Sequence, residues 1–318
     1  MGQKTRICLV LVVTLLAAAC GSAGKPVDPA PVGLVDRPQP AHVGGADQTG
    51  GSATQNNCNA LASLSPSKTT SAGSTMTKIK ESGKLIVGVD QTTFLFGFRN
   101  PTTGNLEGFD IDIANQVAAA LFGSAEGHIQ FKAIPSSQRE IVLKAHQVDI
   151  VVRTYSITCS RLKDINFSSV YYQAGQRILV DKASKVTKLA DLAKKKVCAT
   201  KTSTSLTKIA ADPSKPVPVS VDNWSDCLVM LQQGQVEAVS TDDVILAGMA
   251  AQDPTLKIVG DRFTEENYGI GIPKDNDDMV RFVNAVLEDV RAGPWKTSYN
   301  RWLAPRLGDA SAPSPQYK

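Results

Sequence analysis

Residues 148–175 read VDIVVRTYSITCSRLKDINFSSVYYQAG and place an apolar run, a polar turn and an arginine in quick succession. The apolar run at 149–152 predicts a buried strand, and open α/β sheets bind ligands where such strands end. Ser156 and Thr158 then offer hydroxyl groups, and Arg161 falls in the first turn of a predicted helix. A guanidinium beside free backbone N–H groups suits a carboxylate. The alternative is a surface arginine in a capped helix.

Strands and helices alternate around this stretch. The first series is β–α–β–α–β, which predicts a parallel sheet with right-handed crossovers. Its strands are expected at 85–89, 129–133 and 149–152, and its helices near 109–121 and 137–145. A second series has strands at 177–180, 196–200, 217–221 and 236–240, with helices between them. One of these helices carries an apolar stripe, which we interpret as core packing: Trp224, Cys227, Leu228 and Leu231.

The final part of the chain predicts a return to the first sheet. A strand at 268–272 leads into a helix at 277–291 and a second helix that opens at Pro294. Crossings near 173–175 and 259–261 would join two lobes by a hinge, with a ligand bound between them. We expect lobe 1 at residues 75–173 and 260–304, and lobe 2 at residues 174–259.

The amino-terminal segment predicts export. Its basic start and short apolar core indicate a signal peptide at 1–19, because the apolar run is too short to span a membrane. Residues 17–20, AAAC, resemble a bacterial lipoprotein cleavage box, in which Cys20 would carry the lipid. An ordinary signal peptidase site is the alternative. The composition of 20–74 and of 305–318 predicts a flexible tether and a flexible tail.

Four cysteines remain once Cys8 is removed with the signal and Cys20 is assigned to lipid. An even number outside the cytosol indicates two disulfides, for which three pairings are possible. We favour Cys198 with Cys227, which leaves Cys58 to pair with Cys159. Zinc is the competing use of four cysteines, but the chain has no CxxC pair. The formal net charge of +4 falls to +2 without Lys4 and Arg6, which argues against a nucleic-acid partner.

Several segments in combination resemble extracellular solute-binding proteins of the polar amino acid group, which serve ABC importers. They include LIVGVD at 85–90, NLEGFDIDIANQVA at 105–118, SITCSRLKDINFS at 156–168, TKTSTS at 200–205 and YGIGIPKD at 268–275. The resemblance covers about residues 79–302 and is strongest to actinobacterial glutamate-type binders, which also have a cysteine pair at positions 198 and 227. It implies an α/β, two-lobed type II periplasmic-binding-protein fold, with a mainly parallel sheet and flanking helices in each lobe.

The resemblance also implies a set of ligand-binding residues. Arg161 would bind the ligand α-carboxylate, and Asp242 would bind its ammonium group. The residues implied to assist at the carboxylate are Thr154 and Ser156 in the first lobe, and Thr200, Ser203 and Thr204 in a turn of the second. For that turn the alternative is a plain Ser/Thr helix cap.

Ligand specificity depends on the side-chain end of the site. Arg139 stands where glutamate and aspartate binders of this group have a carboxylate-binding arginine, which favours an acidic ligand; an exposed Arg139 at a helix start is the alternative. Asp90 stands where glutamine binders keep an aspartate, so glutamine and asparagine remain open. Phe94 would pack near the ligand or in the lobe core. Arg99 and Arg153 are further candidates for the distal carboxylate.

Taken together, the sequence predicts a monomeric protein on the outer face of the cytoplasmic membrane, held there by a lipid anchor. It would bind glutamate or aspartate, or else asparagine or glutamine, and deliver it to an ABC transporter permease. The main alternative is a sensor that reports amino acid levels to a transmembrane receptor or kinase. An enzyme such as a dehydratase is disfavoured, because the three histidines are scattered and no catalytic, phosphate-binding or metal motif is present. No cofactor or metal is expected.

Overall fold

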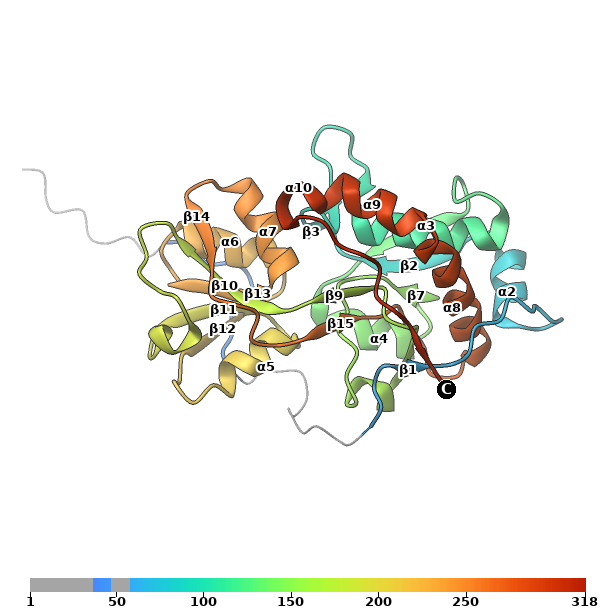
Figure 1. Cartoon of the computed structure of the whole chain (residues 1–318), viewed down its shortest axis with the longest axis horizontal. Coiled ribbons are helices and arrows are strands. Elements are labelled where there is room, and N and C mark those ends of the chain that lie inside the picture. Colours follow the sequence, from blue (N-terminus) through green and yellow to red (C-terminus); the bar gives the residue numbers. More distant parts are fainter. Residues whose placement is uncertain (1–36, 47–57) are drawn as a thin grey trace, which may run out of the picture. The chain divides into compact units, whose positions relative to one another are not determined.

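The computed structural model describes residues 37–46 and 58–318, and the described residues from Pro38 onward belong to one compact unit. The predicted signal peptide, Cys20 and most of the predicted tether lie outside the described residues. Among the helices that are described, none is long and apolar enough to cross a membrane. Two five-stranded sheets dominate the unit, and each has helices packed against it (Figure 1).

The first sheet has the strand order β6-β2-β7-β16-β8. The strands span Ile129–Ala133 (β6), Leu85–Val89 (β2), Ile150–Val151 (β7), Gly271–Pro273 (β16) and Ile165–Phe167 (β8). Only β16 runs against its neighbours, so the sheet is mainly parallel as expected. Its helices are α2 (Thr75–Ser82), α3 (Phe109–Phe122), α4 (Arg139–Lys144), α8 (Asp277–Arg291) and α9 (Pro294–Trp302), with short 3₁₀ turns η2 (Ser136–Gln138) and η3 (Arg161–Lys163).

The second sheet has the order β12-β11-β13-β10-β14, and again a single strand, β10, is antiparallel to its neighbours. The strands span Val217–Val221 (β12), Lys196–Thr200 (β11), Ala238–Asp242 (β13), Gln176–Asp181 (β10) and Leu256–Val259 (β14). Its helices are α5 (Thr204–Ala210), α6 (Trp224–Gln232) and α7 (Asp243–Gln252), with the 3₁₀ turn η4 (Leu189–Leu192). A small sheet of β3 (Thr92–Thr93), β4 (Gly97–Arg99) and β5 (Leu106–Glu107) follows β2.

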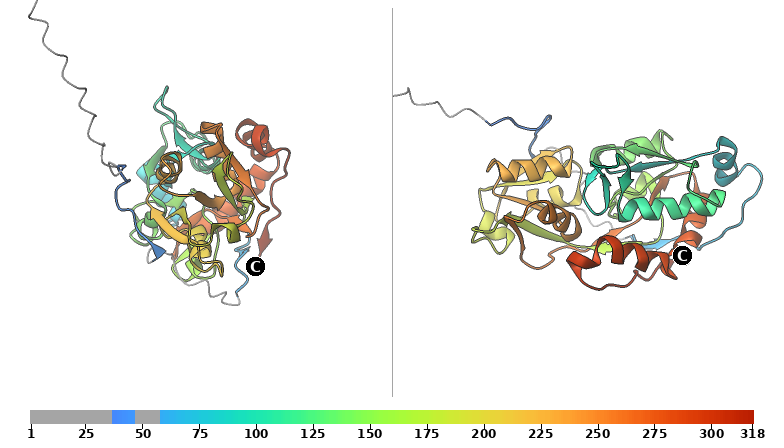
Figure 2. Two further views of the ribbon diagram at one scale, coloured as in Figure 1. Left: turned by 90° about the vertical axis from the view of Figure 1, so that its left-hand side faces the viewer. Right: turned by 90° about the horizontal axis from the view of Figure 1, so that it is seen from above.

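Two chain crossings join the sheets. β9 (Tyr172–Ala174) and β15 (Glu266–Tyr268) pair antiparallel and lie between the two sheets (Figures 1 and 2). The first crossing lies where the sequence predicts it. The second lies at 266–268 instead of 259–261, because residues 256–259 remain in the second sheet as β14, paired with β10. The predicted strand at 268–272 is accordingly divided between β15 and β16. The predicted lobe limits stay a prediction.

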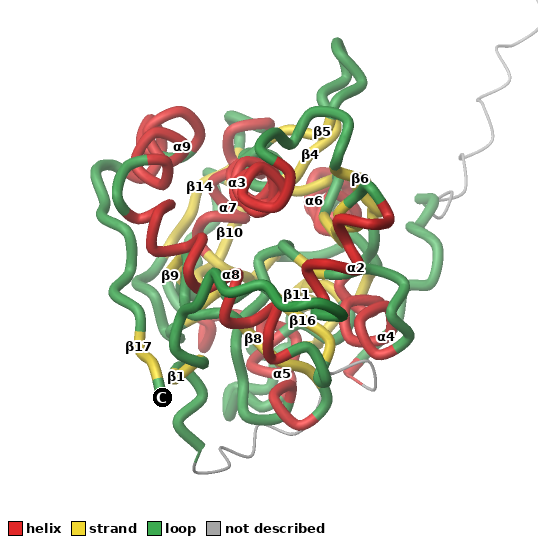
Figure 3. The backbone as a smooth tube through the Cα atoms, turned by 90° about the vertical axis from the view of Figure 1, so that its right-hand side faces the viewer, coloured by secondary structure: helices red, strands yellow, loops and turns green. Residues whose placement is uncertain are grey.

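The structure differs from the expected tether and tail. β1 (Ala62–Ser63) pairs in parallel with β17 (Gln316–Tyr317) (Figure 3), and α10 (Ala304–Leu307) follows α9 (Figure 1). Asn284 of α8 donates hydrogen bonds to the Ser63 hydroxyl at 2.8 Å and to the Leu64 carbonyl at 2.6 Å. Further upstream, Gly44 pairs with Ser220 at the edge of β12. These segments are held by backbone pairing, by polar contacts and by Leu61, Leu64 and Leu307, which pack against the core.

Both predicted cysteine pairs are bonded. Cys198 in β11 joins Cys227 in α6, with an S–S distance of 2.04 Å and a sequence separation of 29 residues. Cys58 joins Cys159 across a separation of 101 residues. The second disulfide ties the amino-terminal segment to the turn after β7, next to the start of η3. It therefore links an otherwise distant part of the chain to the stretch that carries Arg161.

Candidate functional site

A small cavity is lined by residues from both lobes. Seven of the ten predicted ligand-binding residues line it: Arg139, Thr154, Ser156 and Arg161 from the first lobe, and Ser203, Thr204 and Asp242 from the second. The other lining residues were not predicted as ligand contacts: Ser136, Ser205, Trp224, Thr241 and Ile245. Three predicted residues, Thr200, Asp90 and Phe94, are not part of this lining.

Arg161 is held in place from several sides. It is only 7% exposed, which excludes the alternative of a surface arginine. Its Nη1 donates to the Ser156 carbonyl at 2.7 Å, its Nη2 donates to the Thr202 carbonyl of the second lobe at 2.9 Å, and its Nε lies 3.5 Å from Glu140 Oε1. The Thr158 hydroxyl accepts from the Arg161 backbone N–H at 3.2 Å. The guanidinium is thus fixed at the strand end, where the sequence predicts a carboxylate site.

Arg139 lies at the start of α4 and is 4% exposed, so the alternative of an exposed arginine is excluded. Its Nε donates to the Ser136 carbonyl at 2.9 Å, and its guanidinium lies over the Tyr155 ring, 4.2 Å from the centroid. Arg161 lies over the same ring at 4.8 Å. Burial, followed by the positive charge of Arg161, lowers the pKa of Arg139 to about 9. Arg139 is therefore a buried cation at neutral pH, and no described carboxylate forms an ion pair with it.

The strand end that carries Thr154 is strained. Thr154 has a φ of 39°, in the left-handed region that non-glycine residues rarely adopt. Its backbone N–H donates to Asp110 Oδ2 at 2.9 Å, and Tyr171 donates to the other oxygen of Asp110 at 2.8 Å. Burial raises the pKa of Asp110 to about 7. These bonds hold the turn that directs the chain from β7 into the cavity wall.

The second lobe contributes the amino-terminal end of α5. Ser203 is the N-cap, and its hydroxyl accepts from the Leu206 N–H at 3.0 Å, so the predicted capping role is present. Ser203, Thr204 and Ser205 all line the cavity. Thr204 donates to Glu266 Oε2 at 2.9 Å. Because backbone N–H groups at a helix start favour anions, this end of α5 adds positive potential beside the two arginines.

Asp242 is the acidic group of the cavity. It ends β13, is 4% exposed and accepts a hydrogen bond from the Tyr268 hydroxyl at its Oδ2. Its Oδ1 is buried and has no hydrogen-bond partner among the described residues. Burial, followed by the negative charge of Glu266, raises the pKa of Asp242 well above its usual value. A cationic donor beside Oδ1 would favour the ionised form.

Asp90 and Arg153 neutralise each other behind the cavity. Arg153 Nη2 lies 2.8 Å from Asp90 Oδ2, and both side chains are buried. Asp90 also accepts from the Thr93 hydroxyl at 2.6 Å, and Arg153 donates to the Ser136 hydroxyl at 2.6 Å. Arg153 was expected as a candidate for binding the distal carboxylate of the ligand. In the structure Arg153 pairs instead with Asp90, the residue expected to favour glutamine. Neither residue reaches the cavity lining.

Direct contacts join the lobes around the cavity. Thr200 donates to the Ser136 hydroxyl at 3.1 Å, which places this predicted residue at the lobe contact instead of in the lining. The Phe94 ring packs edge-on against Phe98, with 4.7 Å between centroids. The Phe94 carbonyl faces Gly248 of α7, where an added Cβ would lie 2.3 Å from the carbonyl oxygen.

Arg99, the other candidate for the distal carboxylate, is exposed and donates to the Gly104 carbonyl.

The family of bacterial extracellular solute-binding proteins, family 3, matches residues 85–305, which include both sheets and the cavity. The chain belongs to this family. In the part of the chain that the structure describes, no cluster of histidine, cysteine, aspartate and glutamate is arranged to hold a metal ion. The family resemblance predicted from the sequence is confirmed, and so is the two-lobed fold class.

Curated relatives cover most of the family region. The ABC transporter glutamine-binding protein GlnH of Bacillus subtilis (strain 168) is 37% identical over 231 residues, 72% of this chain and 84% of the relative. The glutamine-binding protein of Geobacillus stearothermophilus is 40% identical, over 67% and 81% of the two chains. The glutamate-binding protein GluB of Corynebacterium efficiens is 31% identical, over 73% and 81%. A crystal structure of a mutant of ArgBP from T. maritima has a TM-score of 0.67 at 27% identity, covering 72% of this chain and 99% of that one.

Proposed function

We propose that this chain binds glutamate or aspartate in the cavity between its lobes and delivers it to an ABC importer. The observation that carries the proposal is the charge of the cavity lining. Two guanidinium groups, of Arg139 and Arg161, and one carboxylate, of Asp242, line it. Glutamate and aspartate carry the complementary set of two carboxylates and one ammonium group, so each ligand charge has a counterpart.

The contacts of each group support one orientation of the ligand. Arg161 lies at the strand end opposite the start of α5, where a carboxylate would also accept from backbone N–H groups. We assign the α-carboxylate to this position, with Ser156 and Thr204 beside it. Asp242 Oδ1 has no hydrogen-bond partner among the described residues and would accept from the ammonium group. Arg139 then binds the distal carboxylate.

The same contacts argue against a cationic side chain. A lysine or arginine ligand would place a second positive charge beside Arg139, which is buried and close to Arg161. An amide ligand would satisfy hydrogen bonds but leave the charge of Arg139 unpaired. The names of the relatives include both glutamine and glutamate binders, which supports this range of ligands. We place the acids first because Asp90, the residue expected to favour an amide, is neutralised by Arg153.

We further propose that the protein is exported, that Cys20 carries a lipid, and that the monomeric protein works without catalysis. The two disulfides and the extracellular class of the family support export. Lipid attachment rests on the sequence AAAC at 17–20. Labelled palmitate should enter the wild-type protein but not Cys20→Ser. Co-purification from membranes separates transport from sensing: a permease partner supports uptake, and a receptor or kinase partner contradicts it.

Calorimetry with the purified protein tests ligand binding. Glutamate, aspartate, glutamine, asparagine and arginine are titrated into the wild type and into Arg161→Ala. We expect the acids to bind more tightly than the amides, arginine not to bind, and Arg161→Ala to lose all binding, because it removes the contact common to every α-amino acid. Tighter binding of arginine than of glutamate by the wild type would refute the proposal.

A further inference from the structure

The three tryptophans differ in what their indole N–H groups contact. Trp295 Nε1 donates to the Tyr171 carbonyl at 2.7 Å, and Trp302 Nε1 donates to Asp112 Oδ2 at 2.8 Å. Trp224 Nε1 is buried and has no acceptor among the described residues. Buried indole N–H groups usually find a partner, because a buried donor without one is destabilising. The unpaired donor therefore calls for an explanation specific to Trp224.

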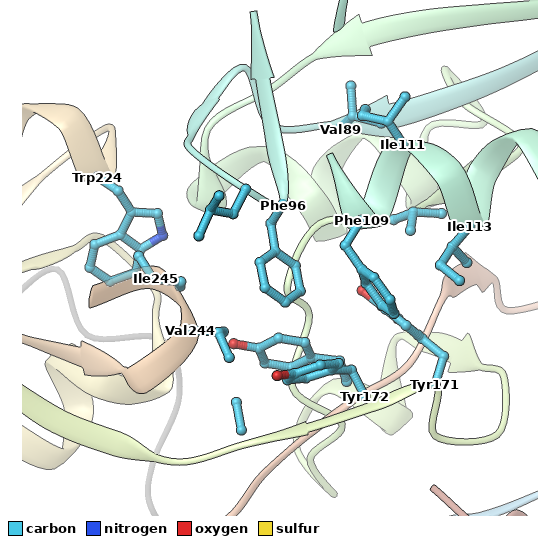
Figure 4. Packing of buried hydrophobic residues seen from close by; sticks show 14 of the residues in the cluster. Val89, Phe96, Phe109, Ile111, Ile113, Tyr171, Tyr172, Trp224, Val244 and Ile245 are labelled. Carbon is cyan, nitrogen blue, oxygen red and sulfur yellow. The ribbon is translucent and has the colours of Figure 1, made fainter. Parts of the chain in front are cut away.

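Trp224 also lines the cavity. It is 3% exposed and lies beside Ile245 on the second-lobe side. Figure 4 shows Trp224 and Ile245 next to each other on the second-lobe side of the buried cluster that also contains Phe96 of the first lobe. The stripe that the sequence predicts as core packing therefore begins with a residue that reaches the site.

The position of the indole is fixed by its surroundings. Trp224 is the first residue of α6, where Asn223 and Asp226 form a capping box. One helical turn later, on the same face, Cys227 is bonded to Cys198 of β11. A donor fixed in this way contributes to binding without first having to be ordered.

We propose that Trp224 Nε1–H donates to an acceptor oxygen on the side chain of the bound amino acid, so that the site selects side chains that end in a carboxylate or carboxamide. This inference rests on the proposed function. The α-carboxylate and ammonium group are already assigned to Arg161 and Asp242. Arg139 and Trp224 are then two donors for the remaining end of the ligand. Arg139 provides charge selection, and the neutral Trp224 N–H donates to a carboxylate or a carboxamide oxygen.

The test uses Trp224→Phe, which keeps an aromatic ring but lacks the N–H, and Trp302→Phe as the matched control, whose N–H bonds outside the cavity. Calorimetry of the full exported chain gives the dissociation constants for glutamate and glutamine. We expect Trp224→Phe to weaken glutamate binding by about 10- to 150-fold and glutamine binding by about 2- to 10-fold, because bonds to charged acceptors are stronger. Trp302→Phe should stay within about two-fold of the wild type.

A second measurement separates a hydrogen bond from a packing role. In a ¹⁵N–¹H spectrum of the wild type, the indole resonance of Trp224 should move on saturation with glutamate, whereas those of Trp295 and Trp302 should not. The resonance is assigned by its loss in Trp224→Phe or, if that variant does not fold, by elimination with Trp295→Phe and Trp302→Phe. An unmoved Trp224 resonance, or glutamate affinity of folded Trp224→Phe within two-fold of the wild type, would overturn this inference alone. A wild type that binds no amino acid would overturn the proposed function as well.

Discussion

Replacing Arg139 with methionine should change which ligand the protein prefers. Methionine fills a similar volume but carries no charge and no donor. In the wild type, Arg139 is 4% exposed and lines the cavity together with Arg161. Arg139→Met should therefore weaken the binding of glutamate more than that of glutamine, whereas Arg161→Ala should weaken both.

The magnitude follows from the burial of Arg139. Two unit charges about 4 Å apart attract each other by about 4 kcal/mol at an effective dielectric constant of 20, and desolvation of the ligand carboxylate offsets part of this. We expect a net loss of about 1.5–3 kcal/mol for glutamate relative to glutamine. The ratio of the two dissociation constants should then change by about 10- to 150-fold. Calorimetry at pH 7 measures both constants.

The unliganded variant should be more stable than the wild type. Burial and the charge of Arg161 lower the pKa of Arg139 to about 9, because both disfavour its charged form in the unliganded protein. Loss of the bond to the Ser136 carbonyl and of the Tyr155 contact offsets much of this. We expect a gain of about 1–2 kcal/mol in the free energy of unfolding by urea.

Arg99→Met is the control for this experiment, because Arg99 is exposed and lies outside the cavity lining. The substitution changes the net charge by the same amount as Arg139→Met. It should alter neither the ligand ratio nor the stability by more than a few tenths of a kcal/mol. A glutamate-to-glutamine ratio unchanged in Arg139→Met would refute the assignment of Arg139. So would an equal change in Arg99→Met.

Three further predictions concern the lobe contact, the acidic group and a disulfide. Gly248→Ala should lower ligand affinity at least about tenfold in calorimetry. The added Cβ would lie 2.3 Å from the Phe94 carbonyl oxygen and would push the lobes apart. Unchanged affinity would contradict this prediction. Because the pKa of Asp242 is raised, its carboxyl group holds a proton in the unliganded protein at pH values below that pKa. A ligand ammonium group favours the ionised carboxylate, so binding should release this proton. Ligand affinity should therefore rise with pH up to the pKa of Asp242. Calorimetric titration in two buffers of different ionisation enthalpy measures how many protons are released or taken up on binding. Proton uptake would count against the role of Asp242. Removing the Cys198–Cys227 disulfide as a Ser pair should cost about 2–4 kcal/mol in urea unfolding, and a cost near zero would show that α6 is held without it.

Much of the fold follows from the sequence because its elements are set locally. The strand at 196–200 and the helix at 277–291 have the predicted limits, since each is an apolar run or periodic stripe with clear ends. The second crossing was misplaced because the end of β14 depends on its pairing with β10, which is not a local property. The packed tail depends in the same way on β1, more than 250 residues away.

The candidate site was only partly predictable. Arg161 was found from the polar turn that follows a buried strand, because strand ends meet at the ligand-binding edge of a sheet, and Asp242 was found from the family resemblance. The pairing of Asp90 with Arg153 was missed, since it requires knowing that β2 and β7 are neighbours. Trp224 was missed as a residue of the cavity lining, because it belongs to an apolar stripe with helical spacing that core packing explains fully. An unpaired indole N–H is visible only in three dimensions.

A crystal structure of the protein with bound glutamate tests the central claim most directly. We predict that the α-carboxylate contacts Arg161, that the ammonium group lies within hydrogen-bond distance of Asp242 Oδ1, and that the distal carboxylate contacts Arg139. A distal carboxylate that points away from Arg139, or a glutamate bound outside the cavity, would contradict the account.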